Sequence, residues 1–144
     1  VSFEPRITLL YESKLKQFAC MLMDGKFWSI YPRSKNIYTL GSVIYSRISS
    51  KTNIINAKRI INNLNKEKLK KIIINFEKQV MSDFPNFKDL FTYVGYYTSL
   101  TTLYNSFSDS RPIIVNRNKN LIQVLGSKID NVIEIEKQIK KIIK

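Results

Sequence analysis

The sequence predicts an α+β fold, in which a mixed, mainly antiparallel sheet carries its helices on one face. Over residues 7–48, short β-rich runs alternate with turn residues, whereas from residue 53 the apolar residues recur at helical spacing. The chain then returns to β-rich runs and ends in an amphipathic stretch. We therefore expect a helix pair at about 53–82 and a C-terminal helix at about 131–143, packed on one face of the sheet.

The first part of the chain is expected to form an antiparallel meander. Asp24-Gly25 lies between two apolar runs and favours a two-residue type I′ hairpin turn, in which both residues take positive φ. Alternation along the return strand then places Tyr31 on one face of the sheet and Trp28 on the other. Gly41 indicates a bulge or a close backbone approach in the next strand. Strands are expected at residues 7–11, 18–23, 27–31 and 37–48.

The middle of the chain is expected to form two helices that begin at asparagine caps. Thr52 or Asn53 can cap the first helix, and Asn65 can cap the second. The Asp83-Phe84-Pro85 step ends the second helix. The remaining elements are expected to be a strand at 91–104 bent at Gly95, strands at 113–115 and 121–125, and a last helix that Asp130 can cap.

Length and composition limit the classes of protein that the chain can represent. Its 144 residues predict a single domain over 1–144. The only cysteine, Cys20, excludes an intrachain disulfide and favours a cytoplasmic setting. The absence of histidine excludes histidine triads and histidine metal sites, so no metal site is expected. No signal peptide and no apolar run of membrane-spanning length is visible, so no membrane partner is expected.

The net charge of +13 would ordinarily indicate a nucleic-acid partner. The chain, however, has 18 Lys against 6 Arg, together with 21 Ile, 13 Asn and only 2 Ala. Codons of an AT-rich genome produce that combination, whereas phosphate recognition usually relies on clustered arginine. Nucleic-acid binding is therefore disfavoured as the reason for the charge.

Few residues have side chains that indicate ligand binding or catalysis. The four glycines form no glycine-rich turn between a strand and a helix, so the chain has no nucleotide loop of its own. Arg111 precedes an apolar strand, and an arginine there can clamp a carboxylate with two parallel hydrogen bonds. Tyr96 and Tyr97 lie on opposite faces of a neighbouring strand and could add hydroxyls. The alternative is that Arg111 pairs with Asp109 or caps a turn.

Four segments in order resemble one known family. They are SIYPR-SKN-IYTLGS at 29–42, FEKQVMSDFPNF at 76–87, YVGYYTSL followed by DSRPIIV, and NLIQVLGSKID before the last helix. This order is similar to the C-terminal half of FAD-dependent oxidoreductases of the D-amino-acid oxidase and glycine oxidase type. The resemblance covers nearly all of residues 6–144.

The resemblance implies a substrate, or cap, domain whose sheet forms one wall of the active site. Tyrosine and arginine side chains of that wall would hold the carboxylate of an amino acid, amine or related small acid. Arg111 matches the family's Arg-Pro pair, and Arg33 matches a Pro-Arg turn with a structural role. The substrate-binding residues expected on this wall are Arg111, Tyr96, Tyr97, Tyr31 and Trp28, of which Tyr96 and Tyr97 are placed by their position in the strand rather than by a motif match. The implied FAD-contacting turn is Gly126, Ser127 and Lys128.

The chain also departs from that family's pattern. The glycine fingerprint of the FAD-binding Rossmann region is absent, and Asp109-Ser110 stands where the family usually has glycine before Arg-Pro. We therefore expect a fragment or subunit that an FAD-binding domain, in the same protein or in a partner chain, completes. FAD would belong to the complete enzyme. The chain alone is expected to bind no flavin and to lack oxidase activity.

Two other functions remain open from the sequence. One is a stand-alone α+β module that binds a small ligand or a protein, for which an exposed apolar sheet face would favour a homodimer. The other is a basic nucleic-acid-binding domain, whose binding would depend on salt.

Overall fold

The computed structural model describes residues 1–103, 113–126 and 131–143. The chain divides into two compact units, Ser2–Leu103 and Tyr104–Lys144 together with Val1, and each is described by itself. The single domain expected over 1–144 stays a prediction.

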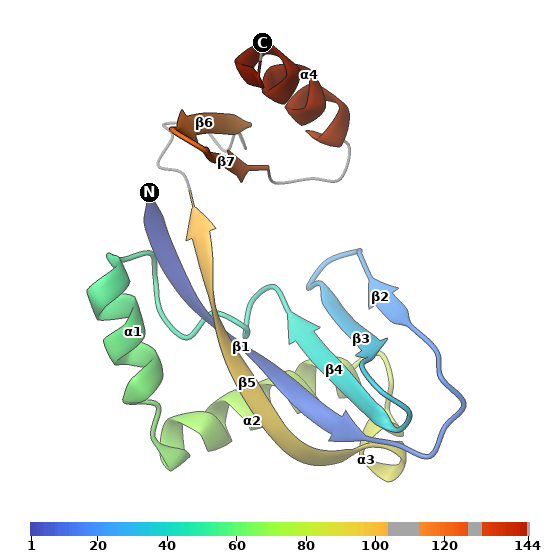
Figure 1. Ribbon diagram of the computed structural model, residues 1–144. Coiled ribbons are helices and arrows are strands. Elements are labelled where there is room, and N and C mark those ends of the chain that lie inside the picture. The colour runs from blue at the N-terminus through green and yellow to red at the C-terminus, as the bar shows by residue number, and fades with distance from the viewer. Residues whose placement is uncertain (104–112, 127–130, 144) are drawn as a thin grey trace. The chain divides into compact units, whose positions relative to one another are not determined.

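The larger unit contains a five-stranded sheet in the order β2-β3-β4-β1-β5 (Figure 1). All its strand pairs are antiparallel, and β1 lies between β4 and β5. The strands are β1 (Ser2–Glu12), β2 (Cys20–Leu22), β3 (Trp28–Pro32), β4 (Ile37–Ser42) and β5 (Thr92–Leu103).

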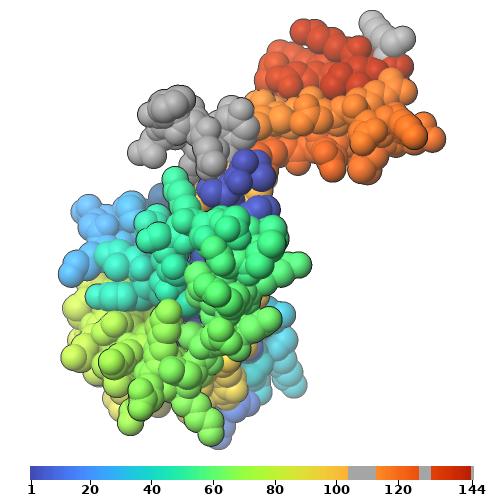
Figure 2. Space-filling view, turned by 90° about the vertical axis from the view of Figure 1, so that its left-hand side faces the viewer, coloured from blue at the N-terminus to red at the C-terminus, as the bar shows by residue number. Residues whose placement is uncertain are grey.

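The helices of the larger unit begin where the asparagine caps predicted. The side chain of Asn53 accepts a hydrogen bond from the Asn56 amide at 2.9 Å, and that of Asn65 accepts one from the Lys68 amide at 2.8 Å. The green atoms of the first helix and of the segment before it form much of the near surface in Figure 2. The helices are α1 (Ile54–Asn62), α2 (Lys66–Met81) and α3 (Phe87–Leu90).

The core lies between the helices and one face of the sheet. Alternate residues of β1 point to this face, so Ile7, Leu9 and Tyr11 are buried while their neighbours are less so. Phe76 and Val80 come from one side of α2 and are fully buried. A cluster of aromatic rings continues the core beyond α2, and it includes Phe18, Tyr38, Phe84, Phe87 and Phe91.

Three strand predictions need correction or refinement. The β2–β3 hairpin is confirmed, but its two-residue type I′ turn is wrong: Leu22 pairs with Trp28 across a five-residue loop, in which only Gly25 has positive φ. The strand expected at residues 37–48 is β4, and it ends at Ser42, because the Ser42 hydroxyl accepts hydrogen bonds from the amides of Ile44 and Tyr45 and starts a turn. The predicted bend at Gly95 coincides with a break in the register between β1 and β5.

The smaller unit consists of a hairpin and a helix. Strands β6 (Ile114–Asn118) and β7 (Leu121–Leu125) pair around a turn in which Lys119 has φ 54°, and α4 (Val132–Ile143) follows. The Arg117 guanidinium donates to the Ile142 carbonyl at 2.7 Å, which joins the hairpin to the end of α4. The predicted cap Asp130 lies outside the described residues.

The predicted α+β class is confirmed, with its mainly antiparallel sheet, its helix pair and its C-terminal helix. No helix in the described parts of the chain is both long enough and apolar enough to cross a membrane.

Replacing Phe76 with alanine should destabilise the larger unit by about 3–5 kcal/mol, because the ring is fully buried and its removal leaves a cavity. Phe27→Ala is the matched control, since that ring is 38% exposed, and it should cost only about 1 kcal/mol. Urea unfolding followed by the fluorescence of Trp28, the only tryptophan, measures both. Equal losses would show that α2 does not pack on the sheet as described.

Stability should also fall as the pH rises above about 10, the ordinary tyrosine value. The buried Tyr11 hydroxyl donates to Glu77 at 3.2 Å, and burial, followed by the nearby Glu77 carboxylate, raises the pKa of Tyr11. The folded state thus keeps a proton that the unfolded chain loses, so the stabilisation is complete below the unfolded pKa and declines above it.

Tyr11→Phe should therefore flatten this decline by up to about 1.4 kcal/mol per pH unit above pH 10. The control is Tyr31→Phe, because the Tyr31 side chain is exposed. Denaturant titrations between pH 9 and about 11.5 provide the comparison. Parallel pH profiles for Tyr11→Phe and the unmodified chain would contradict the role of Tyr11.

Candidate functional site

The candidate site is the open face, the face of the five-stranded sheet opposite the core. Because paired residues in a sheet point to the same side, the register fixes its membership. Ser29 pairs with Gly41 and Tyr31 with Thr39, while Thr8 pairs with Tyr97. The open face includes Glu4, Arg6, Thr8, Leu10, Ser29, Tyr31, Thr39, Gly41 and Tyr97.

An arginine lies on a tyrosine ring at this face. The guanidinium carbon of Arg33 is 4.9 Å from the centroid of the Tyr97 ring, which is a cation–π distance. The turn between β3 and β4 holds Arg33, whose amide donates to the Ile37 carbonyl at 2.7 Å. The sequence suggested only a structural role for Arg33. Its contact with Tyr97 joins residues 64 positions apart, which no local pattern reveals.

A hollow of about 270 Å³ lies next to the strand pair β3–β4. Gly41 and Ser29 have small side chains and leave room for it. A methyl group added at Gly41 would come within 3.2 Å of the Ser29 hydroxyl oxygen, so the two residues are close neighbours. Arg6 borders the hollow, and so do Met21 and Phe27, two exposed apolar residues of the β2–β3 hairpin. Its lining residues are Arg6, Met21, Phe27, Trp28, Ser29, Gly41, Ser42, Val43 and Ser46.

Of the predicted substrate-binding residues, Tyr31 and Tyr97 lie on the open face, and both are partly exposed. Tyr96 points to the opposite side, as the alternation predicted, and pairs with Leu9. The arrangement therefore does not bring Tyr96 and Tyr97 together. Arg111 lies outside the described residues, so its predicted clamp stays a prediction.

Trp28 occupies a core position, although part of it borders the hollow. The side chain is 4% exposed, and its indole nitrogen donates to a carboxylate oxygen of Asp83 at 2.7 Å, just after α2. Gln79 reinforces this link between helix and hairpin, because it donates to the Lys26 carbonyl and accepts from the Ser42 hydroxyl. Trp28 thus fixes the hairpin on α2, and its predicted role toward substrate stays a prediction.

The predicted FAD-contacting turn lies in the smaller unit, and only Gly126 of its three residues is described. A methyl group added at Gly126 would come within 2.7 Å of the Ile135 side chain. Close packing against α4 is therefore a sufficient reason for glycine at this position. Ser127 and Lys128 lie outside the described residues.

An ion-pair cluster that the sequence did not predict lies at the other end of the open face. Glu4 is 3% exposed; one of its carboxylate oxygens accepts a hydrogen bond from Arg6 Nε at 2.6 Å, and the other lies 3.3 Å from Arg47 Nε. Arg47 reaches β1 through an isolated bridge opposite Arg6. Glu4 and Arg47 are far apart in sequence, and this explains why periodicity gave no signal.

Metal chemistry has no support in the described residues, where no group of three potential ligands lies close enough to hold an ion.

Comparison with known proteins gives one informative similarity. The chain is 25% identical to the FAD-dependent monooxygenase FPY4 of Fusarium mangiferae, over 99% of this chain and 39% of that protein. The chain thus spans well under half the length of this relative. No protein-family model and no solved structure matches the chain.

Removing the Asp83 carboxylate should destabilise the larger unit by about 1–3 kcal/mol, because the buried indole N–H of Trp28 would lose its acceptor. Asp83→Ala is compared with Asp89→Ala, which removes an exposed carboxylate and should change stability by less than about 0.5 kcal/mol. Denaturant unfolding and the Trp28 emission wavelength measure the effect. Indistinguishable variants would mean that water replaces Asp83 without cost.

Proposed function

We propose that this chain is the substrate-side sheet domain of an FAD-dependent oxidoreductase of the D-amino-acid oxidase type. Its substrate would be an amino acid, an amine or a related small acid. The relative named as an FAD-dependent monooxygenase supports the flavoenzyme class, because the similarity extends over 99% of this chain. The observation that carries the proposal is the open face, where the Arg33 guanidinium lies on the Tyr97 ring and Tyr31 is a second exposed tyrosine.

The open face has the donors that a carboxylate requires. A guanidinium presents planar, paired N–H groups, and contact with an aromatic ring leaves these groups at its edge available. In residues 1–103, 113–126 and 131–143, no carboxylate lies within ion-pair distance of Arg33. Arg33 would therefore bind the substrate carboxylate, Tyr97 would fix the orientation of the guanidinium, and Arg111 remains a candidate for a second clamp.

The small residues of the open face would receive the rest of the substrate. Gly41 and Ser29 leave a hollow, and the apolar side chains beside it would exclude water from a bound molecule. When bound in the complete protein, FAD would accept the electrons of the oxidation. This chain would contribute substrate binding and orientation, which are the effects that raise the local concentration of the reactive carbon.

The described residues do not fit FAD by themselves. They contain no glycine-rich turn between a strand and a helix that could hold its phosphates. FAD would therefore be held mainly by another domain of the same protein or by a partner chain, with Gly126, Ser127 and Lys128 as a secondary contact. Accordingly, the purified chain should show no flavin absorbance, and a yellow protein would contradict this division of roles.

The proposal predicts where a small amino acid binds. Titration of the ¹⁵N-labelled chain with D-alanine or glycine should give saturable amide shifts at Arg33, Gly41 and Tyr97. Arg33→Gln should weaken binding about tenfold or more, since charge-assisted hydrogen bonds are lost. Arg59→Gln, an exposed arginine of α1, is the matched control and should have no effect.

Two results would contradict the proposal. One is saturable binding on the helix side of the sheet with no change on the open face. The other result combines two observations. The reading frame continues upstream of Val1 without encoding a predicted strand followed by Gly-x-Gly-x-x-Gly, and no partner chain that binds FAD is found.

A further inference from the structure

A short irregular segment creates a second hollow beside the start of β1. The Ile48 amide donates to the Pro5 carbonyl at 2.9 Å, and Phe3 and Thr52 exchange two backbone hydrogen bonds of 2.8 and 2.9 Å. Residues 49–51 therefore lie opposite Glu4 alone and must bow away from the strand. The resulting hollow has a volume of about 590 Å³, and its lining residues are Glu4, Arg47, Ser49, Ser50 and Lys51.

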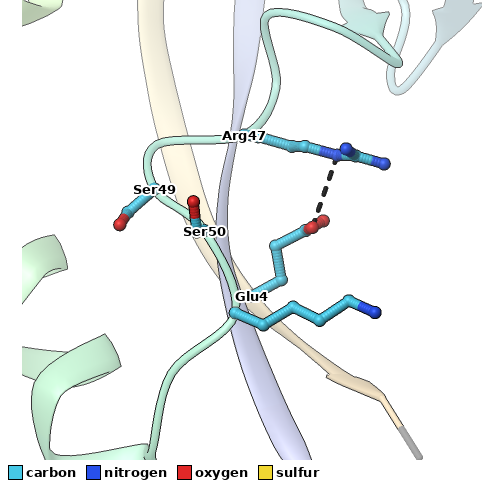
Figure 3. A pocket seen from close by; sticks show the side chains of 5 residues that line it. Glu4, Arg47, Ser49 and Ser50 are labelled. Carbon is cyan, nitrogen blue, oxygen red and sulfur yellow. Dashed lines mark ion pairs between the residues drawn. The ribbon is translucent and has the colours of Figure 1, made fainter. Parts of the chain in front are cut away.

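Both oxygens of the Glu4 carboxylate are already engaged. Arg6 contacts one of them through Nε and Nη2. Arg47 approaches the other through Nε, as Figure 3 shows. A carboxylate buried to this degree is tolerated only when it is paired in this way. Glu4 is consequently a positioning residue that holds the two guanidinium groups, and it offers no free oxygen for a cation.

The cluster keeps an excess of positive charge. Arg47 and Lys51 line the hollow together with Glu4, whereas Arg6 contacts the Glu4 carboxylate without lining the hollow. These three cations oppose a single carboxylate, so the group as a whole has a net charge of +2. The Arg47 side chain is 54% exposed, and it approaches the Glu4 carboxylate through Nε at 3.3 Å. Ser49 and Ser50 also line the hollow, and a serine hydroxyl can donate a hydrogen bond to a charged oxygen.

We propose that this hollow binds the phosphate group of a small molecule. A phosphate monoester carries about −1.5 to −2 charges at neutral pH, which matches the two uncompensated cations better than a carboxylate does. Arginine binds phosphate oxygens in bidentate geometry, and lysine adds a point charge. The hollow is larger than a phosphate group, so the remainder of the molecule has room beside it. This inference does not depend on the proposed flavoenzyme function.

The test is an NMR titration of the ¹⁵N-labelled 144-residue chain at constant ionic strength. Glycerol 3-phosphate and inorganic phosphate represent a phosphomonoester and the free ion, and acetate is the carboxylate control. We expect saturable amide shifts at residues 47–51 with both phosphates, tighter binding of glycerol 3-phosphate, and no comparable response to acetate. Inorganic phosphate binding as tightly as glycerol 3-phosphate would overturn the assignment to a larger molecule.

Variants locate the binding within the hollow. Arg47→Gln and Lys51→Gln should each weaken phosphate binding about tenfold. Lys51 is exposed and forms no ion pair in the described parts of the chain, so Lys51→Gln should leave folding intact. Arg47→Gln removes one partner of the buried Glu4 carboxylate and should cost some stability, so unfolding curves first establish that this variant is folded under the binding conditions. Arg59→Gln and Lys66→Gln are the matched controls from exposed positions on helices and should bind like the unmodified chain. Equal responses to acetate and phosphate, or equal losses in variants and controls, would overturn the proposal.

Discussion

The larger unit depends on the pairing of β1 with two antiparallel neighbours. β1 exchanges hydrogen bonds with β4 along one edge and with β5 along the other, so its side chains are fixed to two faces with a period of two. Ile7, Leu9 and Tyr11 thereby reach the core, and a slip of one residue would expose all three. The core in turn holds α2, because Phe76 and Val80 pack on these residues.

The same constraint produces both candidate sites. Since the odd-numbered residues of β1 face the helices, Glu4, Arg6, Thr8 and Leu10 must face the other way, where the α1–α3 helices do not pack. One part of the open face has Arg33 on Tyr97, and another has the buried Glu4 between two arginines. The alternation along β1 therefore leaves one face of the sheet for polar residues, and Arg33 and Arg47 reach that face from segments outside the strands.

The two proposals use different chemistry on this face. Arg33 contacts an aromatic ring and is proposed to bind a small carboxylate against the sheet. Arg47 is paired with the Glu4 carboxylate and is proposed to bind a phosphate group, which carries nearly two negative charges. Separate variants of the two arginines can thus separate the two functions. If both hold, a single sheet face would bind two groups of one substrate or of two ligands.

The sequence by itself determined the α+β class, the asparagine caps at Asn53 and Asn65, the two faces of β3 and the break near Gly95. These features follow from spacing, cap chemistry and turn residues, which act over a few positions. The predictions for the turn at Asp24-Gly25 and for the end of β4 were wrong. The Ser42 hydroxyl ends β4 by accepting a hydrogen bond from the Tyr45 amide. The Gln79 side chain and the Trp28–Asp83 hydrogen bond fix the hairpin through contacts at α2, which local patterns do not reveal.

Only the tertiary structure decided that Arg33 meets Tyr97 and that Glu4 holds Arg6 and Arg47, because the sheet brings together residues that local patterns cannot connect.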